Sequence, residues 1–343
     1  MAMFRIAAAT FLAAASGVLP AAAETTAEFF KGKTITINIG VPAGGDYDVR
    51  GRLLARHMDR HIPGAPAIVA RNMPGAGGVV SANWLSALAP RDGTALLMVM
   101  QNMPLAQALQ MEGVKFKSEE YNWIGNMTDS PNLLSVMSTS RVKTVEDARR
   151  MEATIASAGP GSGSYSYTAA ANLIGGTKFR IVTGYAGGSH MNLAMERGEV
   201  DGRGSNAWSA WKSTKPDWIA EKKLVHLIQI ALKRHPDLPD VPLLLELASN
   251  DLDRKVVRLL SADTAISKAL ATSPGVPPDR VEALRRAYDA TMKDPKFLEE
   301  ADKRGVDVNP VSGEEVQKIV TEIVETEPEV RRRAGNIVHG RKD

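Results

Sequence analysis

The sequence contains no cysteine among its 343 residues. This absence excludes disulfide bonds, thiol nucleophiles and cysteine-based metal sites. Aromatic residues make up only 5% of the chain, charged residues make up 24%, and the formal net charge is +3. These values are ordinary for a soluble globular protein. No cluster of Lys and Arg alternates with aromatic residues, so the composition does not favour binding to nucleic acid.

Motifs for catalysis and for nucleotide binding are also missing. The sequence has no G-x-S-x-G, H-E-x-x-H or G-x-x-x-x-G-K-[ST] pattern, and its GPGSGS segment does not match G-x-G-x-x-G. His57 and His61 lie four residues apart and could share a helix face, but no carboxylate cluster supplies a third metal ligand. We therefore expect no metal and no cofactor, and an exported enzyme is the least favoured alternative.

Long hydrophobic runs are absent except at the N-terminus. Arg5 precedes an apolar segment, residues 6–18, which is too short to span a bilayer that needs about 20 apolar residues. Ala21 and Ala23 then form an A-x-A cleavage pattern. We expect residues 1–23 to be a signal peptide that is cleaved after Ala23, which places the mature protein in the periplasm. An uncleaved N-terminal anchor is the alternative.

The remaining chain alternates strand and helix patterns. Strands are predicted at residues 34–39, 67–70, 94–99, 153–158 and 177–183, and helices at 47–62, 79–88, 280–292, 295–304 and 313–324. Residues 259–269 are predicted to be a strand or a short helix. The order strand, glycine- or serine-rich loop, helix recurs at residues 35–58, 153–174 and 179–198. This pattern predicts an α/β fold with parallel strands and with helices on both faces of each sheet.

Three of the loops have a composition that suits anion binding. Gly44 and Gly45 precede one helix, three serines from Ser162 to Ser166 precede another, and Gly187 to Ser189 precede a third. Helix N-termini offer free N–H donors and a partial positive charge, and glycine allows a ligand to approach the backbone. Each loop alone is explained equally well as a turn with an N-cap. Together, at the carboxyl ends of strands, the three loops favour a ligand site.

Longer segments of the chain match one family. They are VPAGGDYDVRGRLLA (41–55), RNMPGAGGVVSANWLSALAPRDGTALL (71–97), GSGSYSYTAAANL (161–173), GYAGGSHMNLAMERGEVDG (184–202), DLPDVPLLLEL (237–247) and PGVPPDRVEALRRAYDATMKDPKF (274–297). In their order and spacing they resemble the solute receptors of the tripartite tricarboxylate transporters, the Bug family. The resemblance covers nearly the whole chain after residue 23.

The resemblance implies a two-domain Venus-flytrap fold of the periplasmic binding proteins, in which each domain is a mainly parallel sheet flanked by helices. Domain 1 would comprise residues 24–128 and 235–343, and domain 2 residues 129–234. The protein would be a monomer that captures a small carboxylate between the domains and delivers it to membrane subunits of the transporter. A receptor of the same fold that reports the ligand to a signalling partner is the alternative.

The resemblance also implies a set of ligand-binding residues. They are Ala43, Gly44, Gly45 and Asp48 in domain 1, and Ser162, Ser164, Tyr165, Gly187, Gly188, Ser189 and Asp201 in domain 2.

The chain departs from the family pattern at several of these points. Ala43 replaces a common phenylalanine, the bulky Tyr47 lies beside the first loop, and Tyr167 stands where histidine is common. Arg203 and Trp208 lie at the expected edge of the cleft. There Arg203 could pair with a second carboxylate and Trp208 or Tyr165 could stack on an aromatic acid. A surface charge and core packing are the alternative roles of Arg203 and Trp208.

Overall fold

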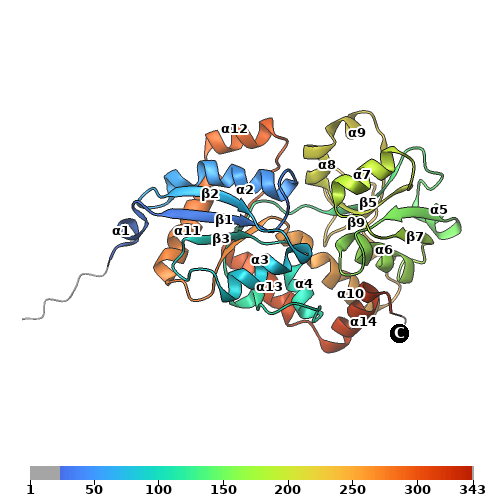
Figure 1. Cartoon of the computed structure of the whole chain (residues 1–343). Coiled ribbons are helices and arrows are strands. Elements are labelled where there is room, and N and C mark those ends of the chain that lie inside the picture. Colours follow the sequence, from blue (N-terminus) through green and yellow to red (C-terminus); the bar gives the residue numbers. More distant parts are fainter. Residues whose placement is uncertain (1–23, 342–343) are drawn as a thin grey trace, which may run out of the picture.

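The computed structural model describes residues 24–341, so the predicted signal peptide lies outside the described residues. Within that range, no helix is both long and apolar enough to cross a membrane. The chain forms two sheets that lie beside each other, each with helices around it (Figure 1). We call each sheet with the helices that flank it a lobe.

The first sheet has the strand order β11-β4-β10-β3-β1-β2. Its strands are β1 (Thr34–Ile39), β2 (Ala67–Asn72), β3 (Ala95–Met98), β4 (Asn122–Asn126), β10 (Ala269–Thr272) and β11 (Val311–Ser312). Strand β1 pairs in parallel with both β2 and β3, whereas β10 is antiparallel to β3 and β4, and β11 is antiparallel to β4. The chain leaves this sheet after β4 and returns to it with β10.

The second sheet has the order β7-β6-β8-β5-β9. Its strands are β5 (Asn132–Met137), β6 (Ala153–Ala156), β7 (Phe179–Val182), β8 (Gly202–Ala207) and β9 (Leu224–Ile230). Strand β6 is parallel to β7 and β8, and β5 is antiparallel to β8 and β9. The carboxyl ends of β6, β7 and β8 therefore lie at one edge of the sheet.

Helices cover both sheets. The first lobe has α1 (Thr26–Phe30), α2 (Asp46–His57), α3 (Val79–Ala87), α4 (Met103–Ala108), α11 (Pro278–Thr291), α12 (Pro295–Lys303) and α13 (Gly313–Val324). The second lobe has α5 (Val145–Arg150), α6 (Gly163–Leu173), α7 (Gly188–Glu196), α8 (Trp208–Thr214) and α9 (Pro216–Ala220). Two further helices, α10 (Asp251–Ala262) and α14 (Pro328–His339), pack against each other and against α6 (Figure 1).

The apolar residues of β1 show why the strand lies in the middle of a layered structure. Ile35, Ile37 and Ile39 are fully buried in one hydrophobic cluster, which also holds Leu53 and Leu54 of α2. Burying each of these side chains stabilises the fold by about 1.5–3 kcal/mol relative to exposure. The run TITINI therefore forms a strand that is covered by helices, as expected for a parallel sheet.

The predicted architecture of two sheets flanked by helices is confirmed, and parallel strands form one part of each sheet. The sheets are mixed, however, because β5, β9, β10 and β11 run against their neighbours. The prediction for residues 259–269, a strand or a short helix, is correct only in part. These residues hold the end of α10, the 3-10 helix η5 (Asp263–Ile266) and the first residue of β10. The N-cap of α10 is Asn250, so the apolar residues at its end belong to an amphipathic helix that begins earlier.

Candidate functional site

Two of the loops with anion-binding composition, those before α2 and α6, lie where the two lobes meet. Figure 1 shows β1 pointing toward the second sheet, so its carboxyl end and the loop before α2 face that lobe. From the other side, the loop before α6 reaches the first lobe. Its Gly161 lies so close to the side chain of Met111 that a Cβ at this position would clash with Cε of Met111. A cavity of about 10 Å³ lies at this contact, between α4 and the first turns of α6. It has room for about one water molecule, so the lobes are closely apposed here.

Asp48 fixes the loop before α2. Its carboxylate accepts hydrogen bonds from the Gly44 amide at 3.0 Å, from Asn72 Nδ2 at 2.8 Å and from Arg52 Nε at 3.0 Å. Burial opposes ionisation of this carboxyl, but the hydrogen bonds outweigh it and lower the pKa of Asp48. Because Asp48 already holds the Gly44 amide, the free backbone donors at this end of α2 are those from Gly45 onward, where no side chain caps the helix.

The serines of the second loop hold the loop itself together. Ser162 Oγ donates to the Gly159 carbonyl at 2.6 Å and accepts from the Tyr165 amide, so Ser162 is the N-cap of α6. Ser164 Oγ accepts from the Ala158 amide at 3.1 Å. Both hydroxyls therefore form hydrogen bonds within the loop and stabilise its conformation. The hydroxyl of Tyr165 lies against Gly340, near the C-terminus, so closely that a Cβ at Gly340 would clash with it.

The third loop covers a buried arginine. Gly187 and Gly188 begin α7 without a side-chain cap. Directly beneath them lies Arg203 of β8, whose Nη1 donates to the Gly188 carbonyl at 3.2 Å and to Asn192 Oδ1 at 2.8 Å. The guanidinium also lies over the ring of Trp211, 5.5 Å from its centroid.

Arg203 is exceptional among the predicted site residues because its charge is unmatched. It is only 7% exposed, its Nε has no hydrogen-bond partner, and no carboxylate of the described residues forms an ion pair with it. Burial alone lowers the pKa of Arg203 to about 10, so the side chain is still a cation at neutral pH. A buried cation without a counter-ion is costly, and an anion bound beside it would offset that cost.

Two other predicted residues are engaged elsewhere. Asp201 Oδ2 accepts from the amide and the hydroxyl of Thr154 at 2.7 and 2.8 Å, and so joins β8 to β6 away from the loops. Trp208 is 8% exposed, and its Nε1 donates to Asp237 at 2.8 Å while its ring meets the His226 ring edge-on. The structure thus places the loops before α2 and α6 at the junction of the lobes and Arg203 beneath the loop before α7, and it gives Asp201 and Trp208 packing contacts.

A further glycine-rich loop, the one after β2, was not among the predicted ligand-binding segments. Its residues Gly75, Ala76, Gly77 and Gly78 all have positive φ, and α3 begins after them without a side-chain cap. Since β2 is next to β1, this loop lies beside the loop that Asp48 fixes. The glycine-rich segment NMPGAGG between a strand and a helix was a sufficient signal to find it.

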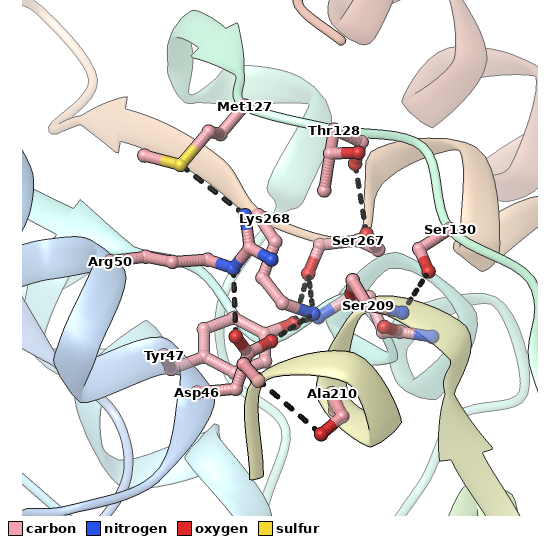
Figure 2. Close-up of polar contacts among 12 residues, drawn as sticks. Asp46, Tyr47, Arg50, Met127, Thr128, Ser130, Ser209, Ala210, Ser267 and Lys268 are labelled. Carbon is pink, nitrogen blue, oxygen red and sulfur yellow. Dashed lines mark hydrogen bonds and ion pairs between the residues drawn. The ribbon is translucent and has the colours of Figure 1, made fainter. Parts of the chain in front are cut away.

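A polar cluster at the first turn of α2 was missed as well (Figure 2). Asp46 Oδ1 accepts from Arg50 Nε at 2.8 Å, and Asp46 Oδ2 faces Lys268 Nζ at 3.3 Å. The Tyr47 hydroxyl donates to the Ser267 carbonyl and accepts from the Gln101 amide. No sequence pattern indicates this cluster, because Lys268 comes from a distant segment.

Among residues 24–341, no group of three or more His, Asp or Glu side chains is placed to hold a metal ion. The donors at the junction of the lobes are backbone amides, hydroxyls and buried cations. Such a set can bind an anion.

The sequence and the fold are similar to those of known proteins. The model of the tripartite tricarboxylate transporter family receptor, TctC, matches residues 21–335. The UPF0065 protein in the gbd 5' region of Cupriavidus necator is 27% identical over 340 residues, which cover 96% of this chain and 95% of that protein.

Solved structures share the fold. The periplasmic binding protein BugD superposes with a TM-score of 0.66 at 22% identity, over 88% of this chain and 98% of its own. Rpa4515 of R. palustris with adipate gives 0.66 at 20% identity, over 88% and 97%. MatC from Rhodopseudomonas palustris with bound malate gives 0.63 at 21% identity, over 89% and 99%. The predicted periplasmic-binding-protein fold is therefore confirmed.

Proposed function

The chain belongs to the tripartite tricarboxylate transporter family of receptors, and on that premise we propose that it captures a small carboxylate between its two lobes for such a transporter. The candidate ligands are dicarboxylates, tricarboxylates, acidic amino acids and aromatic acids. Two relatives of the same fold were solved with malate and with adipate, which supports an organic acid as ligand.

The observation that carries the proposal is Arg203. Its guanidinium is buried beneath the first turn of α7, has an unused donor at Nε and has no acidic partner in the described chain. Arg pairs with carboxylate through charge-assisted hydrogen bonds, and the amides at the start of α7 add further donors. A ligand carboxylate would supply the negative charge that the chain does not provide.

The remaining parts of the proposal follow from this role. Residues 24–128 with 235–343 and residues 129–234 would be the domains, which close over the ligand by a hinge motion as in other two-lobed receptors. The protein would act as a monomer in the periplasm, make or break no bond, and meet membrane subunits after closure. These subunits and the cleavage after Ala23 are part of the proposal.

A thermal-shift screen tests the proposal. The purified protein is melted with aliphatic mono-, di- and tricarboxylates, acidic amino acids and aromatic acids. An acid at a hundredfold excess over its Kd should stabilise the protein by about 2.7 kcal/mol. The Arg203→Gln variant should lose at least about tenfold in affinity, since a buried charge pair contributes roughly 2–5 kcal/mol.

Arg180→Gln is the matched control, because Arg180 lies in the same sheet but is exposed and paired with Glu152 at 3.0 Å. It should bind as the unmodified protein does. If no acid shifts the melting temperature, or if Arg203→Gln binds normally, the proposal is wrong. The alternative role is to report the ligand to a signalling partner. Uptake of the acid is therefore measured in cells that lack the gene, and it should be lost only if the protein is a transport receptor.

A further inference from the structure

The polar cluster at the first turn of α2 has more positive than negative charge. Arg50 and Lys268 share a single carboxylate, Asp46, at distances of 2.8 and 3.3 Å. The side chains of Arg50 and Lys268 are 0% and 3% exposed. Two buried cations against one carboxylate leave one positive charge unmatched, which is costly inside a protein.

Asp263, the nearest other acid, does not complete the balance. The Tyr167 hydroxyl lies 2.9 and 2.8 Å from its two carboxylate oxygens, and Asp263 forms no ion pair with Lys268. Burial raises the pKa of Asp263 to about 7, so at neutral pH the carboxyl is only about half ionised. Burial also lowers the pKa of Lys268, which shows that Asp46 and Asp263 do not fully offset the cost of burying its charge.

Donors in the cluster are also left unused. Arg50 Nη2 has no hydrogen-bond partner among the described residues, and neither has the hydroxyl of Ser209 on α8. Lys268 Nζ donates only to the Ser267 carbonyl, at 3.1 Å, since its contact with Asp46 Oδ2 does not have hydrogen-bond geometry. It also lies over the Tyr47 ring, 4.4 Å from the centroid. Unsatisfied buried donors in a native structure call for an acceptor.

The cluster lies at the junction of the lobes. Lys268 directly precedes β10, which is antiparallel to β3, so it lies at the edge of the first sheet where β3 ends. Helix α8 of the second lobe packs against α2, and Figure 2 shows Ser209 and Ala210 of α8 across from Asp46 and Lys268. Movement of α8 away from α2 would open the cluster to a ligand.

We propose that Lys268, together with Arg50, holds a second anionic group of the ligand in the first lobe and so sets a preference for acids with two negative charges. The proposal rests on the proposed function, in which Arg203 of the second lobe holds the first carboxylate. Each lobe then contributes one unmatched buried cation, and only a ligand with two acidic groups satisfies both. Lys268 is a specificity-determining residue in this arrangement.

The test compares acids that differ by one carboxylate. Binding of succinate and butyrate, adipate and hexanoate, and suberate and octanoate is measured by calorimetry. The unmodified protein should bind at least one diacid about tenfold or more tightly than the monoacid of the same length. Lys268→Met should lower the affinity for that diacid by about tenfold and that for the monoacid by less than about twofold, because only the diacid reaches this site.

Two further variants make the result specific. Lys268→Arg keeps the charge and should keep the diacid preference, whereas Lys296→Met removes an exposed lysine and should change nothing. Without ligand, Lys268→Met should melt no lower than the unmodified protein, since it leaves Asp46 and Arg50 as a balanced pair. A structural role of Lys268 predicts a lower melting temperature instead.

The outcomes separate this inference from the function on which it rests. Equal loss of diacid and monoacid binding in Lys268→Met, or no loss of either, overturns the role of Lys268. The same conclusion follows if the unmodified protein binds monoacids as tightly as diacids, while the proposed function stands. Failure to bind any acid in the wider screen overturns the proposed function itself.

Discussion

The phenolic oxygen of Tyr167 lies 2.9 and 2.8 Å from the two carboxylate oxygens of Asp263, and both side chains are buried. Tyr167 belongs to α6 of the second lobe, and Asp263 to η5, which leads into β10 of the first sheet. One hydrogen-bonded pair therefore joins the second lobe to the segment that enters the first sheet. Burial raises the pKa of the Asp263 carboxyl in this pair, so its protonation can be tested through the pH dependence of stability.

Asp263 should make the protein less stable as the pH rises toward neutrality. Burial raises the pKa of Asp263 to about 7 from 3.8, so the folded protein binds a proton between these values that the unfolded chain has released. The contribution is complete below pH 3.8 and is lost as the pH passes 7, by at most about 4 kcal/mol. Urea unfolding from pH 4 to 8 should show this loss, and Asp263→Asn should remove it. Tyr167→Phe should shift the loss to higher pH, because the phenol stabilises the carboxylate; an unchanged profile in both variants would contradict the assignment.

His226 should act in the opposite direction. Its ring nitrogen is 2.8 Å from Ser135 Oγ, and burial lowers the pKa of His226 to about 4 from 6.5. Between these values the unfolded chain binds the extra proton, so stability falls as the pH drops from 6.5 to 4, by at most about 3 kcal/mol. His226→Gln should flatten this part of the urea-unfolding profile. If the slope below pH 6.5 is the same with and without His226, the ring is not held neutral.

Gly45→Val should abolish ligand binding without unfolding the protein. A Cβ at Gly45 meets no atom within 4 Å, and its φ of −90° suits any residue. The side chain would nevertheless cover the free amides that begin α2, where the family resemblance implies that the ligand binds. Calorimetry and melting temperature give the two readouts. Gly335→Val, which also meets no atom within 4 Å, is the control, and normal binding by Gly45→Val would remove this loop from the site.

The ion pair between Lys212 and Asp307 should favour the closed arrangement of the lobes. Lys212 Nζ of α8 lies 2.8 Å from Asp307 of the first lobe, and both side chains are partly exposed. Asp307→Lys replaces this attraction by repulsion, and about 1 kcal/mol lost from the closed state weakens ligand binding about fivefold. Small-angle scattering should show a larger radius of gyration without ligand. The double variant Lys212→Glu with Asp307→Lys should restore both values in part, because Lys212 also lies 3.6 Å from Asp237. Asp302→Lys should leave them unchanged. A swap that restores neither value would show that the pair has no role in closure.

The local features of the fold were predictable from the sequence because neighbouring residues determine them. The β-branched run of β1, the glycines before α2 and α7, and Ser162 as the N-cap of α6 all lie within short segments. Antiparallel β10 was not predictable in this way. Its apolar residues ALAT follow directly on the apolar end of α10 and η5, and periodicity does not separate a short buried strand from such a helix.

The candidate site was predictable only in part. Composition identified the loops, and the family resemblance pointed to Arg203. Neither shows that Arg203 has no acidic partner, which depends on every side chain packed around it. Nor does either show that Asp48 takes the Gly44 amide. Lys268 and Asp46 are far apart in the chain, and their charge balance exists only once β10 has paired with β3.

The position of helix α14 has a consequence for the order in which the protein folds. It packs against α6, and Ala334 and Ile337 of α14 are buried in the same cluster as Ala170 of α6. Whenever the chain is delivered from its N-terminus, α6 arrives long before α14, so the side of α6 that α14 covers lacks this partner until the last residues have been delivered. The contact between α6 and α14 is therefore among the last to form.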